Sequence, residues 1–234
     1  MPLETASHYA GPLRIVRERV KPERDSNNRE TYRRRWWQFG EPCVDLRKSI
    51  AALPRFAVGL STGKRACFVW GPAGTTMNNS TVVFALDDDF SMGVLQSRAH
   101  VAWAWAQAST LETRLRYTPT SVFMTFPWAG AFATDVQREA VAEACRQLLA
   151  RRSEICQAEQ IGLPKLYNAM DEGAWADLKT LHQALDESVA ACYGWSRSVA
   201  QDDAEIVRRL TALNKEITEG GRAYDPFSAV GDPT

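Results

Sequence analysis

The spacing of apolar residues first separates a polar segment at the start of the chain from the rest. Residues 1–41 carry few regularly spaced apolar side chains and predict an extended arm. Pro42 then stands where a helix can begin. Leu46, Ile50 and Leu53 follow at the spacing of one helical face, so a short amphipathic helix is predicted after the arm.

Beyond this helix the apolar period changes to two. Turn sequences rich in Gly, Ser and Asn separate short apolar runs, which is typical of a small antiparallel sheet. The helical period returns over 91–106, and one more strand is predicted at 122–126. We therefore predict an α+β domain over 42–130, with its first three strands within 55–60, 66–70 and 81–86.

The remainder of the chain has a helical pattern. Thr134 and Gln137 have the spacing of a capping box, in which each side chain bonds to the backbone of the other residue. Further apolar stripes run over 178–189 and 206–217. These patterns predict an all-helical C-terminal domain over 131–219, followed by a loose tail at 220–234.

Composition is that of a globular protein, with 45% hydrophobic and 24% charged residues. Apolar runs fall well short of a membrane span, and the N-terminus has no signal-peptide pattern, so a cytoplasmic protein without membrane contact is expected. The five cysteines include no Cys-x-x-Cys pair, which disfavours a disulfide framework or a structural zinc site.

The formal net charge is zero, but the charges are unevenly distributed. Residues 11–50 contain eleven basic and six acidic residues, a balance of +5, whereas residues 135–190 contain six basic and ten acidic residues, a balance of −4. The front of the chain is therefore the expected anion-binding part.

Basic and aromatic side chains together provide the candidate nucleic-acid contacts. Guanidinium and ammonium groups neutralise phosphates, and indoles stack on bases. For the two tryptophans, packing into the protein core is an equally good use. The candidate DNA-binding residues are Arg33, Arg34, Arg35, Trp36, Trp37, Lys64, Arg65 and Arg98.

Catalytic signatures are absent from the sequence, and no catalytic residue, metal site or cofactor site is assigned. The run 59–64 is one residue short of a phosphate loop. The acidic run 87–89 is expected to be a solvated turn, and His182 with Asp186 a surface pair on one helix. His100 lies on an apolar helix and is expected to be a core residue with its hydrogen bonds satisfied.

Several segments, in this order along the chain, resemble one known family. Gly93-Val94-Leu95-Gln96-Ser97-Arg98-Ala99-His100 and Thr125-Phe126-Pro127-Trp128 resemble the target recognition domain of the MmeI-like restriction–modification DNA methyltransferases. Leu181-His182-Gln183-Ala184-Leu185-Asp186-Glu187 resembles the helical C-terminal domain of the same family. The resemblance extends from about residue 14 to 218.

The resemblance implies a DNA-binding specificity module that recognises double-stranded DNA for an adenine methylase. In that family, S-adenosylmethionine is the cofactor of a separate methyltransferase domain, which this sequence does not contain, and the enzymes serve bacterial defence. The methylase would be a separate subunit or would have been lost. The alternative is a protein-interaction or vestigial fragment without DNA binding of its own, which the acidic helical region favours.

Overall fold

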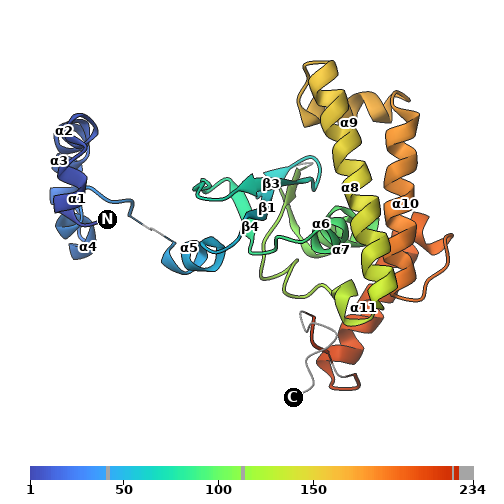
Figure 1. Cartoon of the computed structure of the whole chain (residues 1–234). Coiled ribbons are helices and arrows are strands. Elements are labelled where there is room, and N and C mark those ends of the chain that lie inside the picture. Colours follow the sequence, from blue (N-terminus) through green and yellow to red (C-terminus); the bar gives the residue numbers. More distant parts are fainter. Residues whose placement is uncertain (41–42, 112–113, 223, 227–234) are drawn as a thin grey trace. The chain divides into compact units, whose positions relative to one another are not determined.

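A computed structural model describes residues 1–40, 43–111, 114–222 and 224–226. The chain forms two compact units, Met1–Ser49 and Ile50–Thr234. Helices together with two small antiparallel sheets confirm the predicted α+β class (Figure 1). Within the described residues, no helix is both long and apolar enough to cross a membrane.

The first unit is helical, so the predicted extended arm over 1–41 is wrong. Trp36 is buried with 8% of its surface exposed, and the indole N–H of Trp37 donates to the Met1 carbonyl at 3.1 Å. Most of these helices are too short to show a 3.6-residue period in the sequence, which is why the pattern was missed. Glu41 and Pro42 lie outside the described residues. The helices are α1 (Leu3–Ser7), α2 (Ala10–Arg19), α3 (Lys21–Asp25), α4 (Glu30–Arg34) and α5 (Val44–Ile50).

The second unit begins with a three-stranded antiparallel sheet in the order β3-β1-β4. The central strand places Val58 opposite Val69 on one side and Val83 on the other. The three predicted strands are confirmed: the first has the predicted bounds, the second begins and ends two residues later, and the third ends two residues earlier. They are β1 (Arg55–Leu60), β3 (Phe68–Pro72) and β4 (Thr81–Phe84).

A second antiparallel sheet, in the order β2-β6-β5, was not predicted. Its strands have two or three residues each, too few for a clear alternation of apolar and polar side chains. They are β2 (Thr62–Gly63), β5 (Ser109–Leu111) and β6 (Arg114–Arg116).

The helical stretch predicted over 91–106 is two helices, α6 (Asp89–Gln96) and α7 (Arg98–Gln107). Ser97 separates them, because its extended backbone ends α6 while its hydroxyl accepts from the His100 N–H and caps α7. The strand predicted over 122–126 is wrong: this stretch forms turns, and the Val122 N–H donates to the Thr118 carbonyl at 2.9 Å.

The C-terminal helices share one core with the sheet. A Cβ added at Gly93 of α6 would lie 2.8 Å from Val141 and 3.2 Å from both Cys145 and Leu185, so α6 packs tightly against α8 and α10. The stretches predicted as separate domains on either side of residue 130 therefore lie in one compact unit. The helices are α8 (Asp135–Ala158), α9 (Leu163–Asp171), α10 (Ala176–Cys192) and α11 (Asp203–Thr218), with short 3-10 turns at Ala129–Ala131 and Val199–Gln201.

Both ends of this helical region have local anchors. The capping box predicted from Thr134 and Gln137 is present at the start of α8. Of the stretch 220–234, predicted to be loose, Tyr224 is held: its hydroxyl accepts from the Trp128 N–H at 2.7 Å and donates to the Phe126 carbonyl at 3.2 Å. Residues 223 and 227–234 lie outside the described part.

The outer edge of β3 is covered by two side chains from the helices. The Gln96 amide accepts from the Phe68 N–H at 3.4 Å and donates to the Phe68 carbonyl at 2.5 Å. The same carbonyl accepts from the guanidinium of Arg152, which is only 5% exposed, at 2.9 Å. Because an edge strand leaves its outward backbone groups without a strand partner, these bonds allow Phe68, at the start of β3, to be buried.

His100 is a core residue with both ring nitrogens bonded, as predicted. Its Nδ1 lies 2.9 Å from the Leu95 carbonyl, which can only accept, so Nδ1 carries the proton. Its Nε2 therefore accepts from the Tyr117 hydroxyl at 2.9 Å. Complete burial of the ring lowers the pKa of His100 to about 4.

Replacing Gln96 with leucine (Q96L) tests how much the edge of β3 contributes to stability. The buried Phe68 N–H would lose its partner, so we expect the free energy of unfolding to fall by about 2 kcal/mol in urea denaturation. Arg152→Met is the comparison, and its cost should be smaller because it removes a buried charge together with its hydrogen bonds. An unchanged free energy of unfolding in Q96L would show that the Gln96 bonds to Phe68 do not stabilise the sheet edge.

The pKa of His100 predicts a dependence of stability on pH. Between pH 6.5 and about 4 the unfolded state binds a proton that the native ring does not, so stability falls as the pH is lowered through this range. The full loss is about 3 kcal/mol, from 1.36 kcal/mol for each pKa unit. Urea denaturation of wild type and His100→Gln at each pH isolates this contribution, because other titrating groups cancel. Parallel pH profiles would refute it.

Candidate functional site

An exposed basic strand lies at the second sheet. Arg114 and Arg116 are exposed on β6, while Leu115 between them is buried at 2% exposure. Both arginines therefore extend from the same outer face of the strand. Sequence reasoning missed them, although the alternation Arg114-Leu115-Arg116-Tyr117 was the available signal: its two apolar members are buried.

Lys64 belongs to the same surface. It directly follows β2, whose register places Thr62 opposite Arg116 and Gly63 opposite Leu115. Both Lys64 and Arg116 are exposed, and within the described part of the chain neither forms an ion pair. We call Lys64, Arg114 and Arg116 the basic sheet face.

A polar loop ends beside this face. Residues 73–80 connect β3 to β4 and are mostly exposed. The Ser61 N–H donates to the Ser80 carbonyl and the Ser61 carbonyl accepts from the Tyr117 N–H, both at 2.9 Å. Ser61 therefore joins the end of the loop to the start of β2 and the end of β6. Asn79, which precedes Ser80, is exposed.

The structure brings Lys64, Arg65 and Arg98 together, since all three line one pocket of about 620 Å³. Arg65, however, pairs with Asp171 and lies over the Tyr167 ring at 5.7 Å. Arg98 donates to Asp203 at 2.6 Å, a bond that raises the pKa of Arg98. Both arginines therefore already have carboxylate partners on or beside the C-terminal helices.

The predicted surface pair of His182 and Asp186 is wrong, because both side chains are largely buried beside this pocket. His182 contacts the Tyr167 hydroxyl at 3.2 Å, and burial lowers its pKa to about 4. Asp186 accepts from the Arg98 backbone N–H at 2.7 Å, and burial raises its pKa to about 7. The Asp186 carboxylate thus provides a hydrogen-bond acceptor for the first backbone N–H of α7, which has no partner within the helix.

The first unit holds the other predicted contacts. Arg33 and Arg34 are exposed on α4; Arg33 donates to the Asn27 carbonyl at 2.5 Å, and Arg34 lies 3.6 Å from Glu30. Arg35 is exposed at the end of α4. Of the two indoles, Trp36 serves as core of this unit, with Arg17 5.8 Å from its ring centre, whereas Trp37 is half-buried.

The acidic run 87–89 serves the fold. Asp88 accepts from the Ser91 N–H at 2.8 Å and caps α6, and Asp89 pairs with Arg55 at 2.9 Å. Among the described residues, no group of three or more His, Cys, Asp or Glu side chains could hold a metal ion.

Comparisons with known proteins identify the family. The sequence matches the family model of the MmeI target recognition domain over residues 12–130. It is 30% identical over 186 residues to DNA methyltransferase A of Bacillus subtilis (strain 168), covering 78% of this chain and 19% of that protein. The fold is similar to that of the type IIL restriction–modification enzyme MmeI solved in complex with DNA, with a TM-score of 0.66, 18% identity, and coverage of 88% of this chain and 26% of that one.

The chain therefore contains a target recognition domain of the restriction–modification methyltransferase type, over residues 12–130. It belongs to the MmeI target recognition domain family. It spans about a fifth of the length of the curated relative that it matches. The matched family is one of recognition domains.

Proposed function

We propose that this chain recognises a base sequence in duplex DNA for an adenine-specific DNA methyltransferase. The observation that carries the proposal is the basic sheet face within a target recognition domain, where Lys64 and Arg116 are exposed and have no carboxylate partner among the described residues. The solved MmeI complex, similar in fold, contains DNA. Such unpaired charges are the groups that phosphate contacts require.

The division of roles follows from chemistry. Lys64 and Arg116 would contact phosphates and fix the register of the protein on the duplex. Asn79 is the candidate base contact, because it is exposed on the loop that ends beside the basic sheet face and an amide can pair with the N6 and N7 atoms of adenine in the major groove. The neighbouring Asn78 is a poorer candidate, because its amide oxygen already accepts from the Ser80 N–H within the turn.

Arg65 and Arg98 would act mainly by holding the recognition part to the C-terminal helices, because their charges are balanced by Asp171 and Asp203. The assignment of Arg33, Arg34 and Arg35 as phosphate contacts stays a prediction. The methyltransferase, as a separate subunit or another part of a longer protein, would rotate the adenine out of the stack and methylate its amino group.

The double variant Lys64→Ala/Arg116→Ala tests the phosphate contacts. Duplex affinity is measured at several salt concentrations by fluorescence anisotropy, using duplexes selected from a random pool. We expect weaker binding to every duplex, and the slope of log K against log salt should become shallower by about 2 because two contacts are lost.

The matched control is Lys165→Ala/Lys179→Ala, which removes two exposed charges from α9 and α10. Its salt slope should equal that of wild type. Equal losses in both double variants would mean that net charge alone governs binding. If the folded wild-type chain binds no duplex at low salt, DNA recognition is wrong and the protein-interaction role takes its place as the proposed function.

Asn79→Ala tests base recognition separately. We expect the preferred sequence selected from the pool to lose definition at one position, at a cost of about 1–3 kcal/mol for the best site, while the salt slope is unchanged. Gln183→Ala, an exposed amide on α10, is the control and should select the wild-type sequence. An unchanged sequence preference in the Asn79 variant would remove Asn79 from the base-contacting set.

A further inference from the structure

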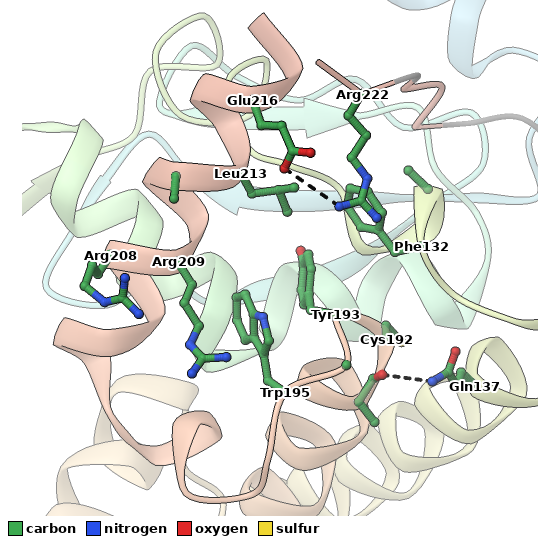
Figure 2. Close-up of a pocket in the computed structure, with 14 residues that line it drawn as sticks. Phe132, Gln137, Cys192, Tyr193, Trp195, Arg208, Arg209, Leu213, Glu216 and Arg222 are labelled. Carbon is green, nitrogen blue, oxygen red and sulfur yellow. Dashed lines mark hydrogen bonds and ion pairs between the residues drawn. The ribbon is translucent and has the colours of Figure 1, made fainter. Parts of the chain in front are cut away.

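A second pocket, of about 900 Å³, lies at the other end of α10, where its last residues meet α11 and the 3-10 turn at Ala129–Ala131 (Figure 2). Three aromatic rings lie in a row along it. The rings of Trp195 and Tyr193 are stacked at 4.4 Å with 17° between their planes, and Phe132 follows at 5.7 Å from Tyr193. All three residues are partly buried, and each exposes part of its side chain to the pocket.

The row of rings has a guanidinium at each end, as Figure 2 shows. Arg209 of α11 lies 5.9 Å from the centre of the Trp195 ring, and Arg222 lies 4.7 Å from that of Phe132. Leu213 of α11 extends into the pocket between them. The pocket thus combines flat apolar surface with separated positive charge.

The charges of this pocket are not fully balanced. Arg208 and Arg209 both donate to the single carboxylate of Glu205, at 2.7 Å each. Among the described residues, the one carboxylate paired with Arg222 is Glu216, at the long distance of 4.0 Å. In the part of the chain that the structure describes, three guanidinium groups therefore share two carboxylates, and the Arg222–Glu216 pair is long enough to be exchanged readily for another anion.

The geometry points to a binding site for an unpaired nucleotide, with its base packed against the exposed parts of the Trp195 and Tyr193 rings and its phosphate at Arg222, whose ion pair with Glu216 is long. Aromatic rings offer stacking to any base, and arginines supply the charge-assisted bonds that a phosphate accepts. The volume is within the range of small-molecule pockets. This site deepens the proposed function, since an unpaired nucleotide arises where duplex DNA is locally opened.

The site is tested on the full 234-residue chain by calorimetric titration with deoxyadenosine monophosphate (dAMP), deoxyadenosine, inorganic phosphate and a single-stranded hexanucleotide. We expect one site for dAMP and weaker binding of deoxyadenosine and of phosphate, because each lacks one half of the recognised chemistry. Tighter binding of the hexanucleotide than of dAMP identifies a DNA strand as the source, and equal binding identifies the free nucleotide.

Two variants address the pocket in different ways. Arg209→Gln/Arg222→Gln removes charge at nearly constant size, and Leu213→Trp fills the space. Each variant should lower the affinity for dAMP about tenfold or more, which is the effect expected for one lost stacking or charge-assisted contact. The control is Arg197→Gln, which alters an exposed arginine paired with Glu187 and should bind dAMP like wild type. Circular dichroism melting confirms that each variant is folded.

Several results would overturn the site: no dAMP binding at millimolar concentration, equal affinity for phosphate and dAMP, or unchanged binding in both pocket variants. Lys64→Ala/Arg116→Ala separates this site from duplex recognition, because it should lose duplex affinity and still bind dAMP. If duplex binding fails in wild type while dAMP binds as described, the proposed function fails and the pocket stands. If the wild-type chain binds duplex DNA but not dAMP, the nucleotide site is wrong and the proposed function stands.

Discussion

The packing of the second unit depends on hydrogen bonds to the backbone N–H and C=O of one edge-strand residue, Phe68. Burying an edge strand leaves its outward N–H and C=O without strand partners, at a cost of about 1–3 kcal/mol for each group. Gln96 from α6 bonds to both groups, and Arg152 from α8 bonds to the carbonyl. A sheet of three strands is thereby attached to the long C-terminal helices, and the two regions share a single core.

This attachment explains why a chain with zero net charge can present a basic surface. Acidic residues of the C-terminal region form ion pairs with arginines of the recognition part: Asp171 pairs with Arg65, and Asp203 with Arg98. Lys64 and Arg116, on the second sheet, are left exposed and without such partners in the described chain. The distribution of paired and unpaired charges, rather than their sum, is what bears on nucleic-acid contact.

Sequence patterns were most informative where local chemistry specifies structure. The capping box of Thr134 and Gln137 and the apolar stripe around Leu185 gave helices that the structure confirms. Patterns failed where tertiary contacts decide. The run 122–126 is short and mostly apolar like a buried strand but lies in turns, because its backbone bonds to nearby residues and its Val122 carbonyl accepts from Trp103. The small helices before residue 41 were too short to show a period.

By itself, the sequence determined the α+β class, the main helices, the first sheet and the family, since periodicity, caps and motif order are local properties of the chain. Only the tertiary structure decided which charges remain exposed. The sequence pointed to Arg98 and not to Arg116, yet Asp203, more than one hundred residues from Arg98, pairs with Arg98, and Arg116 stays exposed. The row of Phe132, Tyr193 and Trp195 likewise exists only because distant segments fold together.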